Sequence, residues 1–362
     1  MSNINTTMMA GLNSKVLQAY INAIPKALTY QSYFPLKNNP FFSWKMLSNN
    51  LSQPNIAAEL QSDNASNTRK RRDIMQSASG DLPLMSISRE MSRGKIKEYQ
   101  IALALAQGNA TATELVRMWA DDVSFCFNGV QSEYEYIAWA LISNAGKLAF
   151  NLSNNVYFSN EFDLDYQVDS TQKTANTVSW ATAATATPIE DLQAVIKASK
   201  PLGLNLKHLW INQDNFYLLQ NTKQIKELTQ VYIGGATIAQ SVPSLEQINT
   251  AIKNVTYLAG LTIHVVDQTI TREAKDGTRT SANPFKDHVA VFTESTVLGS
   301  SQYSILEQND PAIIYAQREN TLIKKYGTAE PVSEITIGES DGVPVLDSAY
   351  RNWYLKTDTN AW

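Results

Sequence analysis

A short segment near the C-terminus carries the pattern that most resembles a catalytic motif. Gly338 to Gly342 read G-E-S-D-G, which has the form G-x-S-x-G. In one large group of hydrolases this pattern holds a nucleophilic serine on a turn between a strand and a helix, with the triad histidine later in the chain. Here Pro344 blocks an immediate helix, and all 3 histidines precede Ser340. The pattern therefore predicts a glycine-rich turn and no hydrolase site.

Three carboxylates form a second candidate site. Glu161, Asp163 and Asp165 would share one face of a strand, because successive side chains of a strand point to opposite faces. Such a group could hold a divalent cation or supply an acid–base pair. Neither a histidine nor a second acidic cluster accompanies them, so a solvated strand face is the better interpretation. A metal-dependent hydrolase that uses these carboxylates is the least favoured alternative for function.

One dense basic run is present, Arg69-Lys70-Arg71-Arg72. Arginine and lysine at this density could contact nucleic acid or the carboxylates of a partner subunit. As a bare sequence signal, such a run is more often a solvated loop. The sequence leaves both interpretations open.

Cysteine and cofactor signals point away from enzyme chemistry. Cys126 is the only cysteine, so the chain can form neither an internal disulfide nor a thiolate cluster. It falls on the apolar stripe of a predicted helix, where we expect a small buried hydrophobe. Phosphate-loop, dinucleotide-binding and zinc patterns are missing. The sequence therefore predicts a protein that is not an enzyme and that binds no cofactor and no metal.

Composition sets broad limits on the class of protein. The chain has 362 residues, of which 43% are hydrophobic, enough for a packed core in two domains or in one domain with extensions. A net charge of −4 argues against a dedicated nucleic-acid binder, which would show a basic face. We find no apolar run of membrane-spanning length and no secretory signal, and expect a cytoplasmic product that stays soluble or assembles.

The longest predicted element is an amphipathic helix from about residue 111 to about residue 152. Its apolar positions recur in steps of 4, 4 and 3, close to the pitch of a straight α-helix. A helix of about 40 residues would be about 60 Å long, far beyond the ordinary globular length. The stripe comprises Leu115, Trp119, Val123, Cys126, Val130, Tyr134, Ile137, Leu141, Ala145, Leu148 and Leu152.

The segments before this helix read as an arm and a loop. A helix is predicted over 12–29, followed by an extended aromatic segment with two prolines, which forbid helix. So much apolar area suggests docking onto a body, the chain's own or a neighbour's. Residues 48–80 are too polar to form a core. An extended stretch at 82–87 and a helix over 92–107 lead to the long helix.

The second half of the chain alternates helical and extended patterns, as in an α/β domain. A half-buried strand is predicted at 162–166, and a Thr/Ala-rich passage at 170–185 is the best candidate domain boundary. Later helices are predicted at 187–199, 213–221 and 244–258, and strands at 206–211, 261–271 and 288–293, with a turn at Asp276-Gly277 and short extended pieces near Ile335 and Val345.

In this order, the segments resemble the major capsid proteins of tailed phages that have the Hong Kong 97 fold, closest to the lambda-type capsid family. The resemblance covers most of the chain and depends on segment order and local patterns. The stretches that carry it are Phe34-Pro35-Leu36, Val178-Ser179-Trp180, Pro188 to Leu192, Leu202 to Ile211, Leu261 to Phe292 and Leu298 to Tyr303.

The resemblance implies an α+β architecture of named parts. They are an N-terminal arm at 1–49, an extended loop at 50–92, a peripheral domain at 93–174 with the spine helix, an axial α/β domain at 175–275, a return to the peripheral domain at 276–334 and a C-terminal part of the axial domain at 335–362. In this family the loop lies over a neighbouring subunit and the arm reaches beyond its own body. Candidate subunit contacts are therefore Phe34, Phe41, Phe42, Trp44, Arg69, Lys70, Arg71 and Arg72.

The implied function is that of a shell subunit. Such a chain would assemble as hexamers and pentamers into the icosahedral head of a tailed double-stranded DNA bacteriophage, in the bacterial cytoplasm, and remain in the virion. Its partners would be other copies of itself, portal and scaffold or decoration proteins, and packaged DNA contacted non-specifically, without a membrane. A mildly negative chain suits a wall that contains DNA without gripping it. An encapsulin-like compartment shell of the same fold is the alternative.

Overall fold

The computed structural model describes residues 4–5, 7–9, 11–26, 28–41, 43–49, 75–105, 112–150, 155, 162–233, 242–274, 276–305, 308, 310–347 and 349–362. The chain divides into two compact units, and each is described by itself. Unit 1 comprises Met1–Trp44, Ser79–Ile137 and Ser300–Val345. Unit 2 comprises Lys45–Ala78, Ala138–Gly299 and Leu346–Trp362.

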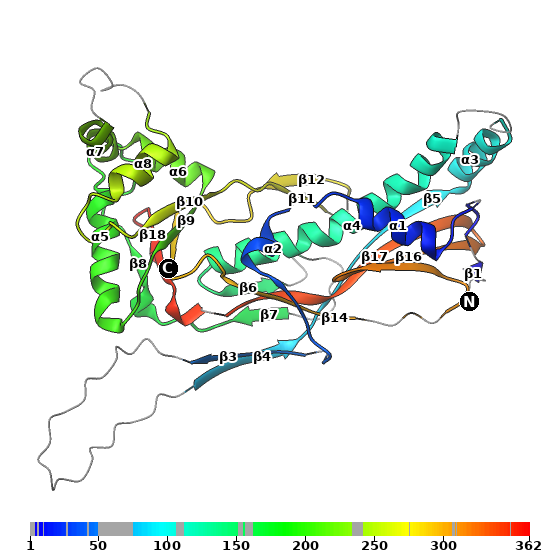
Figure 1. The fold of residues 1–362 in the computed structure, drawn as a ribbon, viewed down its shortest axis with the longest axis horizontal. Coiled ribbons are helices and arrows are strands. Elements are labelled where there is room, and N and C mark those ends of the chain that lie inside the picture. The colour runs from blue at the N-terminus through cyan, green and yellow to red at the C-terminus, as the bar shows by residue number, and fades with distance from the viewer. Residues whose placement is uncertain are drawn as a thin grey trace, which may run out of the picture. The chain divides into compact units, whose positions relative to one another are not determined.

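Unit 1 is built on a seven-stranded sheet. Its strands are β1 (Ile4–Asn5), β2 (Leu36–Asn38), β5 (Leu84–Ser92), β14 (Gly299–Ser304), β15 (Ile314–Arg318), β16 (Thr321–Ala329) and β17 (Val332–Leu346). The path runs β1-β16-β17-β14-β2, with β15 beside β16 and β5 beside β17 (Figure 1). β17 pairs antiparallel with β16 as far as Glu339 and with β5 as far as Asp341. β3 (Ser43–Asn49) and β4 (Met75–Asp81) form a separate two-stranded sheet.

Helices complete the core of unit 1. They are α1 (Ser14–Ala23), α2 (Tyr30–Tyr33), α3 (Arg93–Leu105) and the long α4 (Ala112–Ser143), whose residues from Ala138 belong to unit 2. Apolar side chains of α1, α3, α4 and the sheet form one buried cluster. Its members are Met9, Leu12, Leu17, Ile21, Ile24, Met91, Ile96, Tyr99, Trp119, Ala120, Val123, Cys126, Phe127, Ile314, Ala316 and Ile323.

The long helix ends earlier than its apolar periodicity predicts. The predicted end near residue 152 is wrong, because α4 stops at Ser143. Ala145 and Gly146 have φ angles of 51° and 73°, and the Gly146 N–H donates to the Leu141 carbonyl at 3.0 Å, which closes the helix with a left-handed turn. Leu148 therefore lies on a strand, β6 (Lys147–Phe150), which pairs with β7 (Phe162–Asp165).

The glycine pattern at 338–342 is not a turn, contrary to the sequence-based expectation. It lies within β17, the longest strand described. A Cβ at Gly338 would lie 2.6 Å from the Cys126 carbonyl oxygen, and one at Gly342 would lie 2.0 Å from the Tyr134 hydroxyl. Both glycines therefore let the strand approach α4 more closely than any side chain would allow.

Two predicted helices near the N-terminus also change their bounds. Helix α1 covers only Ser14–Ala23 of the predicted 12–29, because Pro25 disfavours helical geometry at Ile24, where ψ is 124°. Asn13 begins this helix, and its side chain accepts a hydrogen bond from the Val16 N–H at 3.0 Å. The helix predicted at 92–107 is α3, and residues 106–111 lie outside the described residues.

Unit 2 contains a five-stranded sheet with the order β10-β9-β13-β18-β8. The strands are β8 (Lys173–Ala175), β9 (His208–Asn212), β10 (Thr262–Val266), β13 (Val289–Thr293) and β18 (Trp353–Lys356), and the helices are α5 (Pro188–Ser199), α6 (Gln213–Asn221), α7 (Lys223–Ile233) and α8 (Leu245–Ile252). In Figure 1 these helices gather around β9 and β10. Leu209, Ile211 and Ile263 lie on the sheet face that packs against helical residues such as Leu192 and Ile248.

In unit 2 the sequence predicts the starts of α5, α6 and α8, misses α7, and fails at some helix ends. Helix α6 has the predicted bounds, and α8 begins after Ser244 as predicted, with Ser244 and Gln247 forming a capping box. The α8 helix stops at Ile252 instead of Leu258, because tight turns through Val255 replace it. The single strand predicted at 261–271 is β10 plus β11 (Ile270–Glu273), and β11 pairs with β12 (Arg279–Ala282) across the turn at Gly277.

The Thr/Ala-rich passage at 170–185 lies inside unit 2, where β8 pairs with β18. The chain passes from one unit to the other within β3, β4, α4, β14 and β17. The predicted domain boundaries stay a prediction. None of the helices in the described part of the chain combines the length and the apolar character that a membrane span requires.

Candidate functional site

Ser340 is a structural residue of unit 1. Its hydroxyl lies 2.8 Å from the Tyr134 hydroxyl, and both side chains are buried between β17 and α4. Burial raises the pKa of Tyr134 far above its usual value, so Tyr134 cannot take a proton from the serine at neutral pH. This geometry provides no activated nucleophile.

The strand carboxylates also lack a catalytic arrangement. Asp163 and Asp165 project into solvent from β7 while Leu164 is buried, and Glu161 lies outside the described residues. Lys147 contacts Asp165 at 3.1 Å. Partial burial raises the pKa of Asp165, but the Gln167 N–H and Lys147 outweigh it and lower the pKa overall. In the described segments, no group of three or more His, Cys, Asp or Glu residues could hold a metal ion.

Cys126 is buried on α4 and is inert at neutral pH. Its thiol donates a 3.4 Å hydrogen bond to the Thr336 carbonyl, and burial raises its pKa to about 11. The nucleophilic thiolate form is therefore almost absent at pH 7.

Two buried carboxylates fix the N-terminal segment onto unit 1. Glu135 of α4 accepts hydrogen bonds from the Thr29 N–H at 3.1 Å, the Thr29 hydroxyl at 3.0 Å and the Tyr30 N–H at 2.8 Å. Glu334 of β17 accepts one from the Met8 N–H at 3.0 Å and lies 3.9 Å from the buried Lys325 ammonium. Charge-assisted bonds of this kind, made away from water, are among the strongest in a fold.

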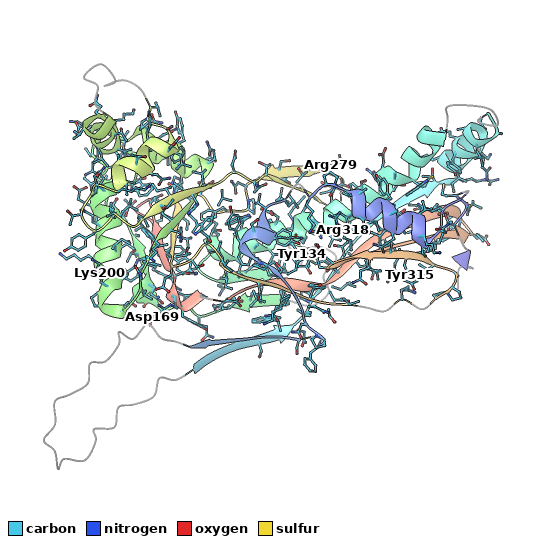
Figure 2. The ribbon with its side chains drawn as sticks, in the orientation of Figure 1. Tyr134, Asp169, Lys200, Arg279, Tyr315 and Arg318 are labelled. Carbon is cyan, nitrogen blue, oxygen red and sulfur yellow. The ribbon has the colours of Figure 1, made fainter. Side chains whose placement is uncertain are left out.

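A third polar clamp holds helix α1. The Arg318 guanidinium, labelled in Figure 2, donates to the Ile21 and Ile24 carbonyls at 2.8 and 2.7 Å. The end of a helix leaves its last carbonyls without intrahelical partners, and here the Ile21 carbonyl also accepts a bond from the Ile24 N–H at 3.2 Å. The described residues of the predicted arm, as far as Trp44, thus belong to unit 1, and some of them, such as Phe34, are buried there.

The aromatic residues proposed as subunit contacts have different environments. Phe34 and Trp44 are buried within the chain itself, at 0% and 4% exposure, so they cannot present surface to a neighbour. That part of the expectation is wrong, because their apolar area is satisfied by their own subunit. Phe41 is 71% exposed. Phe42 lies outside the described residues.

Hydrogen bonds fix the backbone of the turn that carries Phe41. The Asn39 N–H donates to the Tyr303 carbonyl at 2.7 Å, which ties the turn to β14. The Asn39 side chain donates to the Ser43 carbonyl at 2.7 Å and accepts from the Phe41 N–H at 3.0 Å. An exposed aromatic on a fixed turn loses little entropy on binding, which is a property of interface hot spots.

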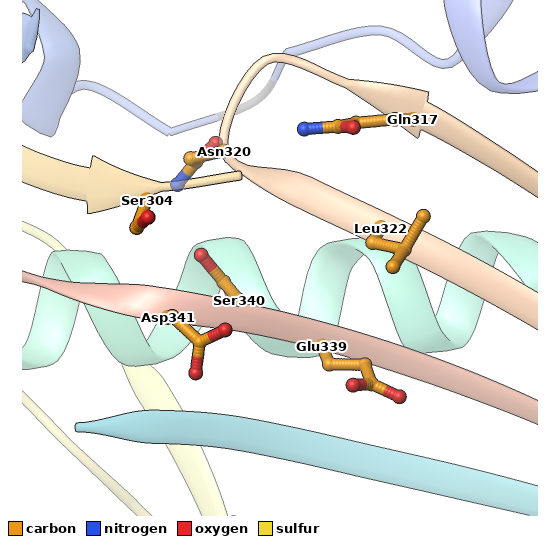
Figure 3. Close-up of a pocket in the computed structure, with 7 residues that line it drawn as sticks. All are labelled: Ser304, Gln317, Asn320, Leu322, Glu339, Ser340 and Asp341. Carbon is orange, nitrogen blue, oxygen red and sulfur yellow. The ribbon is translucent and has the colours of Figure 1, made fainter. Parts of the chain in front are cut away.

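A small polar depression lies on the sheet of unit 1. Its wall is formed by Ser304, Gln317, Asn320, Leu322, Glu339, Ser340 and Asp341. Figure 3 shows Glu339 and Asp341 on one side of β17 and Ser340 on the other. Since Ser340 contacts α4, the two carboxylates lie on the opposite face of the sheet.

The remaining predicted residues are placed as follows. The stripe residues Trp119, Val123, Cys126, Val130, Tyr134, Ile137 and Leu141 are all buried on α4, and Leu148 is buried on β6. The Leu115 side chain and Arg69, Lys70, Arg71 and Arg72 lie outside the described residues. Sequence reasoning missed Glu135, Glu334 and Asp341, because nothing local distinguishes a buried carboxylate from a solvated one.

Comparison with solved structures identifies the fold. A prophage capsid protein of E. coli CFT073 aligns over 95% of this chain and 99% of its own, with a TM-score of 0.58 and 14% identity. A phage-related protein of Bordetella bronchiseptica RB50 aligns over 96% and 97%, with a TM-score of 0.53 and 11% identity. No family model and no curated protein matches the sequence. The chain has the mixed α+β fold of Hong Kong 97-type capsid structures, as its segment order predicts.

Proposed function

We propose that this chain is the major capsid protein of a tailed double-stranded DNA bacteriophage, which assembles as hexamers and pentamers into an icosahedral head. One observation carries the proposal: a prophage capsid protein and this chain correspond over almost the whole length of both. The correspondence covers 95% of this chain and 99% of that protein, so it includes both compact units.

The surface of unit 1 supports a role in assembly. Phe41 is a large apolar side chain kept in solvent on a turn that Asn39 fixes. The chemistry of the described residues supports the same conclusion, since Ser340, Cys126 and Asp165 are all occupied by structural contacts. We propose Phe41 as a contact between subunits, and we keep Arg69, Lys70, Arg71 and Arg72 as candidate contacts of the extended loop.

Electron microscopy and sedimentation of the expressed chain test the proposal. We expect closed shells, alone or together with a scaffold protein encoded beside it. Nuclease-resistant double-stranded DNA inside particles from an infected or induced host would favour the phage head, whereas an enclosed enzyme would favour the encapsulin-like alternative. A chain that stays monomeric under all these conditions would refute the shell function.

A matched pair of variants separates assembly from folding. Phe41→Ser should keep the wild-type melting temperature, because the side chain is already in water, and should reduce particle yield. Phe34→Ser should lower the melting temperature, because that side chain is fully buried. Normal particles from Phe41→Ser would remove Phe41 from the interface.

A further inference from the structure

The depression on the unit 1 sheet contains a buried carboxylate without a partner. Asp341 is only 9% exposed. Among the described residues, no hydrogen-bond donor reaches its carboxylate. By contrast, the neighbouring Glu339 contacts the Lys324 ammonium at 2.6 Å. Most buried charges in folded proteins are paired, so this arrangement calls for a physical explanation.

The unpaired charge is a cost to the subunit by itself. Burial raises the pKa of Asp341, the Glu339 carboxylate raises it further, and Lys324 opposes the shift only in part. The carboxylate oxygens keep only limited contact with solvent, and no donor among the described residues compensates for the water that burial removes. Replacing it with a neutral isostere should therefore stabilise the isolated subunit, which is the reverse of what a structural carboxylate would do.

The site has the charge and the size for one small cationic group. Glu339, Asp341 and Lys324 together carry one uncompensated negative charge. The cavity volume is about 10 Å³, which is room for a single water-sized group. A lysine ammonium is of this size, whereas the planar guanidinium of arginine is broader. A divalent ion would also face the nearby Lys324 ammonium, which disfavours it.

The residues that line the depression can supply further hydrogen-bond acceptors for an ammonium group. The Ser304 hydroxyl and the Gln317 side-chain carbonyl belong to the lining residues, and both are hydrogen-bond acceptors. An ammonium has three donors, so one carboxylate and two neutral oxygens would satisfy it. Gln317 and Glu339, which line the depression, are partly exposed, so a side chain from outside the subunit can reach it.

We propose that this depression receives the ammonium group of a lysine from a second copy of this chain. The proposal rests on the proposed assembly into shells, and it is carried by the charge complementarity between an unpaired carboxylate and a cation. The subunit leaves Asp341 unpaired, and a neighbouring copy supplies the missing charge.

Zero-length crosslinking of mixed-isotope particles tests this contact. Particles are assembled from equal amounts of unlabelled and nitrogen-15 chains and treated with a carbodiimide, which joins a carboxylate and a contacting amine as an amide with loss of water. We expect mass spectrometry to find the Asp341 peptide joined to a lysine peptide of the other isotope. Asp341→Asn should abolish this product, while the matched control Asp163→Asn, which changes an exposed carboxylate, should retain it. Crosslinks from Asp341 to Lys324 of the same chain only, or none, would overturn the proposal.

Two further readouts separate this proposal from the general function. Asp341→Asn should raise the melting temperature of the unassembled subunit relative to Asp163→Asn, and should raise the concentration needed for assembly about tenfold, as expected for one charge-assisted contact. A lower melting temperature would show that Asp341 serves its own subunit and would refute the contact. If wild-type particles form without the crosslink, only this inference fails; if no particles form under any condition, the shell function fails.

Discussion

Substitution of Gly338 by alanine tests the closest approach in unit 1. The new Cβ would lie 2.6 Å from the Cys126 carbonyl oxygen and 2.9 Å from its carbon. Both atoms belong to the backbone of α4, so the strand and the helix must separate, and a side-chain rotation cannot relieve the clash. Overpacking costs about 1–3 kcal/mol, and a backbone obstacle puts this site at about 3 kcal/mol. The gain of about 0.5–1 kcal/mol from removing a strand glycine offsets only part of it.

The assay is thermal unfolding of the unassembled subunit, followed by circular dichroism. The net cost is about 2–2.5 kcal/mol, so at about 2–4 °C per kcal/mol Gly338→Ala should lower the melting temperature by about 4–10 °C. Gly94→Ala is the matched control, because its Cβ would meet nothing closer than the Ser92 hydroxyl at 3.9 Å. Gly129→Ala should fall between them, since its nearest neighbour at 2.8 Å is the movable tip of Ile87. Equal melting temperatures for Gly338→Ala and Gly94→Ala would refute the close-packing explanation.

Three other perturbations test separate parts of the fold. Leu141→Asp puts a charge at a fully buried position of α4 and should cost about 4 kcal/mol or more, and soluble helical protein with the wild-type melting temperature would contradict it. Glu135→Ala strands the Thr29 and Tyr30 N–H groups and should cost about 3 kcal/mol, with faster proteolysis near residue 29 as the check. The His208 Nδ1 and His264 Nε2 atoms lie 3.0 Å apart, and burial lowers the pKa of both side chains. The unfolded chain therefore binds protons more readily, so their contribution to stability is complete above about pH 6.5 and is lost as the pH falls through the lowered folded pKa values. A melting temperature that His264→Gln leaves just as sensitive between pH 5 and pH 7 would exclude this linkage.

Periodicity predicted the elements whose burial follows one local rule. The residues from Trp119 to Leu141 recur at helical spacing, and the structure buries them on α4. Helix starts were predictable for the same reason, because a cap such as Ser244 acts on the backbone a few residues away. These signals depend on short-range geometry, which the sequence displays directly.

The helix end was missed although a local signal exists. Asn144-Ala145-Gly146 is a plausible helix stop, but Leu148 continued the apolar steps and hid it. In the structure Leu148 is buried as a strand residue of β6. Its position therefore fits the apolar spacing of a longer helix and is also buried in a strand. Apolar spacing alone could not distinguish a longer helix from a strand, because both structures bury Leu148.

Other features depend on partners that are distant in sequence. Gly338 looked like a turn residue, yet it is a strand residue because Cys126, more than 200 positions away, occupies the space of its side chain. Phe34 looked like an exposed arm residue, yet its own subunit buries it. Tertiary packing determines whether such a residue is buried or exposed, because the local sequence pattern is the same in the two situations.

The contrast between satisfied and unsatisfied buried groups points to where assembly acts. Glu135 and Glu334 are buried and fully engaged by donors of their own unit, so they stabilise the subunit and need no neighbour. Asp341 is buried nearly as deeply but has no donor among the described residues, and Phe41 stays in water on a turn that is already fixed. Both arrangements cost the isolated subunit free energy that a second surface would recover. A subunit that satisfies the buried Glu135 and Glu334 itself, and leaves Phe41 and Asp341 unsatisfied, can fold alone and still gain from assembly.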